Sequence, residues 1–182
     1  MKKKFKLMSA VMILLSISCS VWAQVGKNQV TYTIDGGTFH HQLITINADP
    51  KVMENGAFTN TVGNYLEINL GDKAMNIKNG TKWGLNIVFN KVSTGAAKVN
   101  DPIPKGVLDH QVYFNLEVQA NGETKFLGID LQKPAKTPGT ITITRFGSVG
   151  GTVEGDFQGT VIDAAGIKYT ITGGHFVASR KS

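Results

Sequence analysis

Apolar and polar residues alternate with a period of two along most of the chain, and no stretch sustains the 3.6-residue period of a helix. Near the start of this pattern, Val30, Tyr32 and Ile34 share one face and threonines occupy the other. Successive side chains of a strand point to opposite faces, so the pattern predicts strands with one buried face. The predicted strands are residues 30–35, 39–47, 65–70, 83–89, 111–118, 126–131, 140–145, 153–161, 167–172 and 175–179.

Short turns separate these strands. Gly36-Gly37, Asn121-Gly122 and Gly173-Gly174 each stand between two predicted strands, and these residues suit the positive φ of tight hairpins. The spacing predicts an all-β fold, an antiparallel β-sandwich or β-barrel of about nine or ten strands. The longer links, residues 48–60 and 91–109, are the expected functional loops, and two prolines keep the second from being a regular central strand.

Two glycines interrupt the apolar face of one predicted strand. Val153, Phe157 and Val161 share that face, with Gly155 and Gly159 between them. Glycine inside a strand predicts a bend or a close approach of another part of the chain.

One segment is echoed near the other end of the chain. Residues 32–39 read YTIDGGTF and residues 169–176 read YTITGGHF, so six of eight positions agree. Either both segments reflect ordinary hairpin chemistry, or they are structural counterparts that lie side by side where a barrel closes.

Residues 1–23 have the three parts of a secretory signal peptide. Residues 1–6 are basic, residues 7–17 are mostly apolar, and Val21 and Ala23 supply the small residues of a cleavage site. An apolar run of eleven residues, at about 1.5 Å each, is too short for a bilayer core of about 30 Å, so no transmembrane span is expected. We expect a signal peptide, 1–23, and a single all-β domain, 24–182, that is periplasmic or secreted.

Cys19 is the only cysteine of the chain. It is either an inert residue of the signal peptide or the lipidated first residue of a bacterial lipoprotein, although Ser16 stands where a lipobox has an aliphatic residue. In both cases residues 24–182 contain no cysteine, which excludes a disulfide framework, a cysteine protease and a zinc finger there.

The formal net charge is +6, from 19 basic residues (Lys and Arg) and 13 acidic residues. Four of the lysines lie in residues 1–6, so residues 24–182 keep 15 basic and 13 acidic residues, a net charge of +2. Arg145 and Arg180 are the only arginines, and the basic residues are scattered. We therefore expect no nucleic-acid partner, because a protein that follows a phosphate backbone needs a basic patch.

Three motifs follow one another near the C-terminus: a G-x-F-x-G strand at residues 155–159, a D-x-x-G turn at 163–166 and a Y-x-I-x-x-G-x-F segment at 169–176. Together they resemble the closing segment of uncharacterised small secreted or lipid-anchored β-sheet proteins of Gram-negative bacteria. The resemblance covers about 25 residues. It implies a β architecture and an exported location, and it assigns no functional residue.

His40, His41, His110 and His175 are the candidate metal ligands, and such a set would suit zinc, nickel or copper. If the two echoing segments pair, His40 or His41 would approach His175. Neighbours in a strand point to opposite faces, so His40 and His41 can share one metal only across a bulge. The alternative is that all four are half-exposed residues of strands and turns.

Recognisable catalytic motifs are absent from the sequence. Glu154 and Asp156 share one face of a predicted strand, but alternation places both opposite Phe157, on the solvent side. The chain has no G-x-S-x-G elbow, no S-x-x-K motif and no glycine loop of a nucleotide site. We therefore expect a protein that is not an enzyme and needs no cofactor.

A binding role remains, for an unknown small molecule, a glycan or a protein of the cell envelope. Tyr32, Trp83, Phe114 and Phe126 would line a ligand pocket inside a barrel, or else would pack the core. Two other functions stay open. One is a small metal-dependent hydrolase that uses the histidines, and the other is an envelope assembly protein that pairs strands at an edge such as residues 140–145.

The signal peptide gives a first testable prediction. We expect a signal peptidase to cut after Ala23, so that the exported protein begins at Gln24. Intact mass spectrometry of protein recovered from the envelope or the medium measures this start directly. Recovery of a chain that still begins at Met1 would contradict the prediction, and a lipid-modified chain beginning at Cys19 would favour the lipoprotein alternative.

Overall fold

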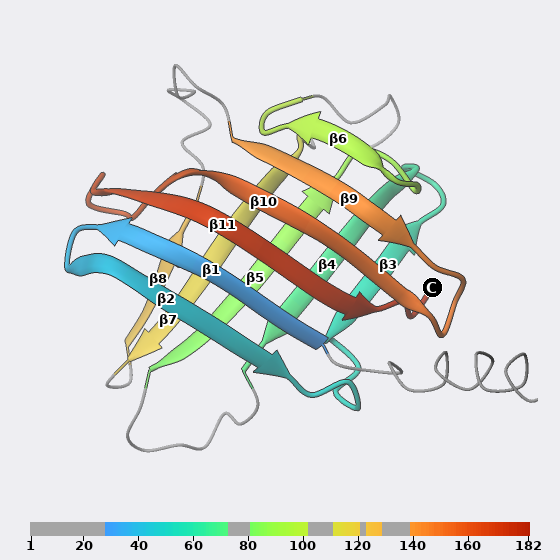
Figure 1. Cartoon of the computed structure of the whole chain (residues 1–182), viewed down its shortest axis with the longest axis horizontal. Helices are drawn as coiled ribbons and strands as arrows, with labels where there is room; N and C mark the ends of the chain where they lie inside the picture. The colour runs from blue at the N-terminus through green and yellow to red at the C-terminus, as the bar shows by residue number, and fades with distance from the viewer. Residues whose placement is uncertain (1–27, 73–80, 102–110, 121–122, 129–138) are drawn as a thin grey trace, which may run out of the picture.

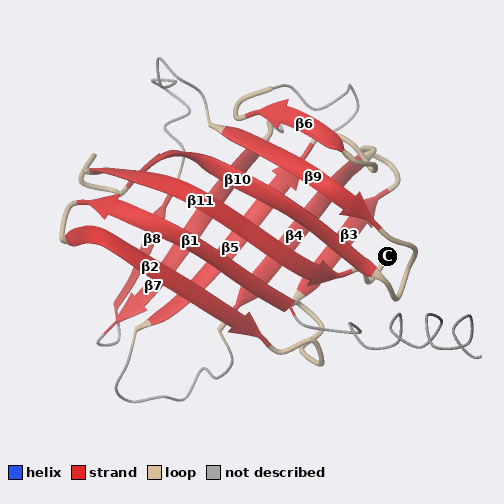
Figure 2. Ribbon diagram, in the orientation of Figure 1, coloured by secondary structure: helices blue, strands red, loops and turns tan. Residues whose placement is uncertain are grey.

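In the described part of the chain, eleven strands form two antiparallel sheets that face each other (Figure 1 and Figure 2). The computed structural model describes residues 28–72, 81–101, 111–120, 123–128 and 139–182. The strands are β1 (Asn28–Gly36), β2 (Phe39–Ala48), β3 (Gly56–Asn60), β4 (Tyr65–Gly71), β5 (Lys82–Phe89), β6 (Gly95–Lys98), β7 (Tyr113–Ala120), β8 (Glu123–Leu127), β9 (Thr140–Phe146), β10 (Thr152–Ile162) and β11 (Lys168–Ser179).

Both sheets are open. The first sheet has the order β2-β1-β11-β10-β9-β6 and the second has the order β3-β4-β5-β7-β8. In Figure 1 the strands of the first sheet run across those of the second. The fold is therefore the predicted all-β sandwich, and the barrel alternative is wrong, because each sheet ends in two edge strands instead of closing on itself.

The core fills the space between the two sheets. Val30, Tyr32 and Ile34 of β1 are fully buried, and the inner faces of β4, β5 and β7 supply the opposite wall. This confirms the alternation predicted for these strands. Each fully buried aliphatic or aromatic side chain contributes roughly 1.5–3 kcal/mol to folding, so the two apolar faces hold the sheets together.

The structure differs from the predicted strand list at four places. The strand predicted at 126–131 is β8, which begins three residues earlier, at Glu123, and ends at Leu127. Two short edge strands, β3 and β6, lie inside the links that were expected to be loops. The two last predicted strands are one continuous strand, β11, of 12 residues. Short edge strands pair on one side only, so their sequences carry a weaker alternation than central strands do.

Gly173-Gly174 forms a bulge inside β11, and the hairpin predicted there is wrong. Gly173 has a φ of 59°, and one extra residue of β11 lies between the pairs that flank the bulge. The extra residue reverses the alternation, so Ile171 before the bulge and Phe176 after it both face the core.

The two echoing segments are neighbours in the first sheet. β1 pairs with β11 in antiparallel fashion, with Thr31 opposite His175 and Ile34 opposite Ile171. Of the two alternatives, the segments do lie side by side, but they meet inside an open sheet and not where a barrel closes, and only the first of them turns back as a hairpin.

The glycines of β10 allow close packing, as their positions predicted. A Cβ at Gly155 would lie 2.7 Å from Cζ of Phe176 and still closer to the carbonyl oxygen of Thr142. A Cβ at Gly159 would lie 2.9 Å from Cα of Gly139. Both positions therefore exclude any larger residue unless the neighbouring strands move.

Two buried asparagines join the sheets at one corner of the sandwich. Asn28, at the start of β1, accepts a hydrogen bond from the Ser179 backbone N–H (2.7 Å) and donates to the Asn55 carbonyl (3.2 Å). The Asn55 side chain accepts from the Gly71 backbone N–H (3.0 Å) and donates to the Asp49 carbonyl (3.2 Å). These amides satisfy backbone groups of both sheets where the strands end.

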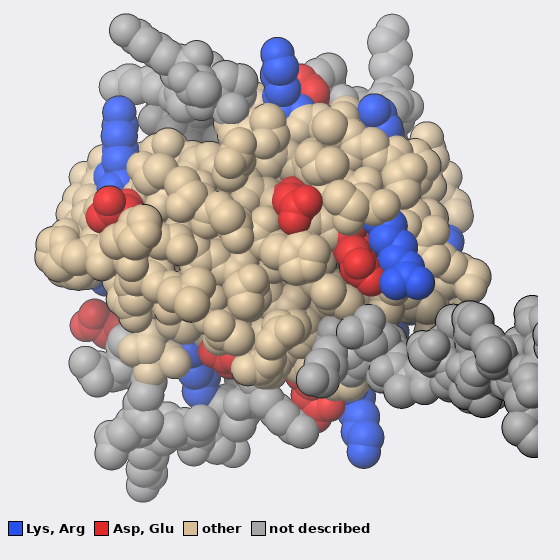
Figure 3. Space-filling view, viewed as in Figure 1, with Lys and Arg blue, Asp and Glu red and all other residues tan. Residues whose placement is uncertain are grey.

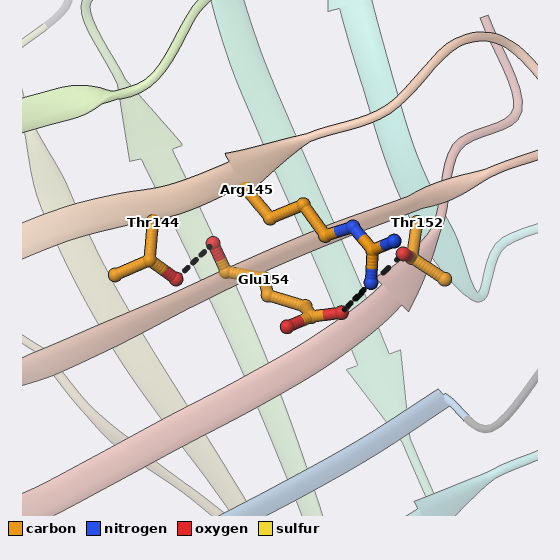
Figure 4. A network of polar contacts seen from close by, with 4 residues as sticks. All are labelled: Thr144, Arg145, Thr152 and Glu154. Atoms are coloured by element: carbon orange, nitrogen blue, oxygen red, sulfur yellow. Dashed lines mark hydrogen bonds and ion pairs between the residues drawn. The ribbon is translucent and has the colours of Figure 1, made fainter. Parts of the chain in front are cut away.

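A polar network fastens β9 to β10 on the outer face of the first sheet (Figure 4). The Arg145 guanidinium lies 2.9 Å from Glu154 Oε1, and the Thr144 hydroxyl donates to the Glu154 carbonyl (3.2 Å). Thr144 is the extra residue of a second bulge, between the pairs Glu154–Arg145 and Gly155–Ile143. The ion pair is exposed and adds little stability, so the network mainly fixes the bulge.

Asp163 organises the D-x-x-G turn between β10 and β11. Its side chain accepts hydrogen bonds from the backbone N–H groups of Ala165 and Ile167 (2.9 Å each) and from the Tyr169 hydroxyl (3.0 Å). The hydrogen bond from Ile167, followed by those from Tyr169 and Ala165, lowers the pKa of this carboxyl below its ordinary value of 3.8. The turn is therefore most stable with Asp163 ionised.

In the part of the chain that the structure describes, no helix is long and apolar enough to cross a membrane. The predicted signal peptide, including Cys19, lies outside the described residues.

The bulge of β11 can be tested with two neighbouring substitutions. Gly174→Ala places a Cβ against the carbonyl oxygen of Phe157, far inside van der Waals contact, so we expect it to lower the free energy of unfolding by about 2 kcal/mol. Gly173→Asn is the control, because no heavy atom lies within 4 Å of its Cβ and asparagine tolerates positive φ. It should cost less than about 1 kcal/mol. Equal losses for the two variants in urea denaturation would contradict the bulge geometry.

Candidate functional site

Three of the four aromatic residues predicted to bind a ligand are buried in the core. The Tyr32 ring lies 6.1 Å from the Trp83 ring and 5.9 Å from the Phe157 ring, centroid to centroid. The Phe114 ring lies 5.2 Å from the same Phe157. These rings pack against one another between the sheets. Phe126 is not among them, because it lies on the outer face of the second sheet with 66% of its surface exposed.

The Tyr32 hydroxyl has no hydrogen-bond partner among the described residues. Burial is the main reason that the pKa of this phenol is raised far above its ordinary value, and the nearby charge of Asp72 adds to the effect. Asp72 itself accepts hydrogen bonds from the backbone N–H groups of Asn47 (3.3 Å) and Trp83 (3.1 Å). Tyr32 therefore stabilises the core chiefly through the packing of its ring against Trp83 and Phe157.

The histidines lie at different places on the first sheet. His40 and His41 are exposed at the start of β2. His175 in β11 pairs with Thr31 of β1, which in turn pairs with Thr45, four residues beyond His41. At about 3.3 Å per residue, this register separates His41 from His175 by roughly 13 Å along the strands. His110 lies outside the described residues, and no group of three metal-binding side chains occurs within them.

His175 instead contacts a carboxylate on the outer face of the first sheet. Its Nδ1 lies 2.8 Å from Asp156 Oδ1. A hollow of about 300 Å³ adjoins this pair, lined by Thr140, Thr142, Asp156, Phe157, Gln158, Gly173 and Gly174. Both partners are about half exposed, so the contact is a surface pair.

A second hollow, of about 260 Å³, lies on the outer face of the second sheet. It spans β4, β5, β7 and β8 and reaches the segment before β3. Its lining consists of Glu54, Asn55, Asn69, Leu70, Gly71, Gly84, Leu85, Asn86, Asn115, Leu116, Glu117 and Phe126. We call this surface the amide hollow.

Strand register builds the amide hollow from two rows of side chains. In one row Gly71 pairs with Gly84, Gly84 with Glu117, and Glu117 with Phe126. The two glycines have no side chains, so the backbone of the sheet forms the floor of the hollow there. The side chains of Glu117 and Phe126 project beside this glycine floor. A Cβ at Gly84 would lie 3.3 Å from Cβ and 3.8 Å from Oε2 of Glu117, so the Glu117 side chain lies close to Gly84.

The second row is made of three asparagines. Asn69 pairs with Asn86, and Asn86 pairs with Asn115 on the next strand. Asn86 Nδ2 donates to Asn69 Oδ1 (2.5 Å), and Asn69 Nδ2 donates to Glu67 Oε1 (3.1 Å). All three side chains are half-buried. Each amide carries two N–H donors and a carbonyl acceptor, so the row presents both kinds of hydrogen-bonding group at fixed spacing.

The amide hollow is acidic in character. Among the residues that the structure describes, its lining contains the carboxylates of Glu54 and Glu117 and no lysine or arginine. Beyond the asparagine row, burial raises the pKa of the Tyr113 hydroxyl, and the charge of nearby Glu67 adds to this effect. Negative charge on one side of the site disfavours an anionic ligand and admits a neutral or cationic one.

One of the expected functional loops forms the rim of the amide hollow. Glu54 and Asn55 belong to the link between β2 and β3, and Asn55 is held in place by its bonds to Gly71 and Asp49. The rim is therefore tied to the floor of the hollow by a buried side chain.

Most residues of the amide hollow were not singled out from the sequence. Alternation does place Asn69, Asn86 and Asn115 on outward faces of their strands. Their alignment in one row, however, depends on the cross-strand register, which a single strand does not encode. Of the predicted ligand-binding residues, only Phe126 belongs to this site.

Comparison of the chain with protein-family models, curated proteins and solved structures found no match.

The buried hydroxyl of Tyr32 gives a testable prediction. Tyr32→Phe removes a buried polar atom that has no partner among the described residues, so we expect the free energy of unfolding to rise by about 1 kcal/mol. Tyr169→Phe is the matched control, because it removes the hydroxyl that donates to Asp163, and it should lower the free energy by about 1 kcal/mol. Urea denaturation measures both. A loss for Tyr32→Phe as large as that of Tyr169→Phe would show that its hydroxyl is bonded.

Proposed function

We propose that this protein is an exported, non-enzymatic binding protein of the cell envelope, and that the amide hollow holds a neutral glycan. The observation that carries the proposal is the alignment of three asparagines, two glutamates and one exposed phenylalanine around a glycine floor.

A sugar ring offers the chemistry that this lining would recognise. Its hydroxyl groups both donate and accept hydrogen bonds, and neighbouring hydroxyls match the paired donor and acceptor of an amide or the two oxygens of a carboxylate. Asn115 makes no side-chain hydrogen bond within the described part of the chain, so its amide is available to a ligand. The carboxylates of Glu54 and Glu117 accept but do not donate, which suits hydroxyl donors.

Phe126 supplies the apolar side of the proposed site. It is one of the few large apolar side chains with most of its surface exposed, and it stands next to Glu117 at the end of the glycine row. A pyranose has an apolar face of C–H groups, and such a face packs on an aromatic ring. Small-molecule sites combine apolar walls with a few placed polar groups in this way.

The expected export of this protein supports the same glycan-binding proposal. The signal-peptide pattern of residues 1–23 directs a protein to the compartment where envelope glycans occur. The proposal needs no cofactor or metal, and it concerns the outer face of one sheet, so it does not depend on the packed core.

Binding to a panel of neutral and charged glycans tests the proposal. We expect a neutral glycan to bind, and we expect Phe126→Ala and Glu117→Gln each to weaken that binding at least about tenfold in titration calorimetry. Both side chains are exposed, so neither change should alter the melting temperature measurably.

Leu43→Ala is the matched control. Leu43 is as exposed as Phe126, at 68% against 66%, but it lies on the outer face of the other sheet. It should leave glycan affinity unchanged. The proposal is wrong if no neutral glycan binds, if only cationic ligands such as polyamines bind, or if Phe126→Ala binds as tightly as the unchanged protein.

A further inference from the structure

The four edge strands of the sandwich differ in how their open backbone edges are protected. An unpaired strand edge presents a row of N–H and C=O groups that can pair with another chain, and proteins normally block it with charge, short length or a covering segment. The edges here are β2 and β6 in the first sheet and β3 and β8 in the second.

Three of these edges show such protection. The C-terminal residues cover β3, because the Lys181 backbone N–H donates to the Ala57 carbonyl (2.8 Å) and the Ser182 hydroxyl accepts from the Thr59 backbone N–H (3.1 Å). β6 is only four residues long and contains Lys98. β8 has five residues, two of which, Glu123 and Lys125, are charged.

Within the described part of the chain, β2 shows none of these three kinds of protection along residues 42–46. It is ten residues long and contains no Asp, Glu, Lys, Arg or Pro. Among the described residues, only Asp72 bonds to its open edge, through the bridge to Ala48 and the hydrogen bond from the Asn47 backbone N–H. At the other end, His41 has a φ of 49°, which interrupts the regular strand. The open regular run is therefore residues 42–46.

The outer face of the first sheet beside this edge also carries few Lys, Arg, Asp or Glu side chains (Figure 3). On that face Leu43 is 68% exposed and Thr45 is exposed beside it, whereas Ile44 and Ile46 point into the core. A strand without charge does not repel a copy of itself.

We propose that the open edge of β2 pairs with β2 of a second copy of this chain, so that the first sheets of two protomers join into one continuous sheet. The pairing is antiparallel about a twofold axis at Ile44, as a symmetric dimer requires. It places Leu43 beside Thr45 of the partner subunit on the outer face, and Ile44 beside the partner's Ile44 on the inner face. Asp72 limits the pairing to residues 42–46.

The prediction that residues 140–145 form an exposed edge is wrong, and β2 takes that role here. Thr140–Ile143 of β9 pair with β6 on one side, while the other side of β9 pairs with β10. A pairing of five residues buries a small area, so the dimer should be weak, with a dissociation constant of about 1–100 µM.

Sedimentation velocity over a range of protein concentrations tests the proposal. The unchanged protein should shift from monomer to dimer, and Leu43→Lys with Thr45→Lys should weaken the dimer at least about tenfold, because the new charges of the two protomers lie side by side. The matched control is Thr170→Lys with Thr172→Lys, which adds the same charge to exposed positions of the same face on the central strand β11. The control should leave the dimer intact.

Two results of this experiment overturn the proposal. One is a protein that stays monomeric at all concentrations, and the other is a control variant that weakens the dimer as much as the edge variant does. If the edge variant fails to fold, its sedimentation does not test the pairing. Amide hydrogen exchange of the unchanged protein then gives a second test that needs no variant. Dimer formation should slow exchange within residues 42–46, and a dimer that leaves these amides unaffected also refutes the pairing. None of these changes touches the amide hollow.

Discussion

The buried pair Asn28 and Asn55 is the contact on which the arrangement of this sandwich most depends. Asn28 joins β1 to β11 and to the segment before β3, and Asn55 joins that segment to the end of β4. Loss of the Asn28 amide would leave the Ser179 N–H of the first sheet without this partner, and loss of the Asn55 amide would do the same to the Gly71 N–H of the second sheet. Each buried group left unpaired costs about 1–3 kcal/mol. The same Asn55 forms the rim of the amide hollow, so one side chain fixes both the corner of the fold and the border of the proposed ligand site.

The two faces of the second sheet differ because successive side chains of each strand point to opposite sides. The inner face packs the core, and the outer face carries the amide hollow. Leu70, Leu85 and Leu116 point into the core, while their neighbours Gly71, Gly84 and Glu117 form the outer row. The proposed ligand site therefore rests on a rigid sheet whose inner face is packed. Sites of this kind are well ordered before the ligand arrives, which reduces the entropy lost on binding.

The sequence predicted the central strands well because alternation is strongest where both neighbours are strands, as for Val30, Tyr32 and Ile34. It failed at Gly173-Gly174, where a pair of glycines suits a hairpin and a bulge equally well, and the choice depends on the strands alongside. It also placed Phe126 with the core aromatics, although Phe126 pairs with the outward Glu117. Which residues share a row across strands is a property of register, and register is set by contacts between segments distant in sequence.

The bulge of β11 changes which alternate residues of the strand face the core. Before it, odd-numbered residues such as Tyr169 and Ile171 face the core, and after it even-numbered residues such as Phe176 and Ala178 do so. A regular strand of the same residues without the bulge would place Phe176 and Ala178 on the outer face of the sheet. The extra residue and the bulge that absorbs it therefore depend on each other, because losing the bulge alone would exchange the buried and exposed faces of the second half of β11.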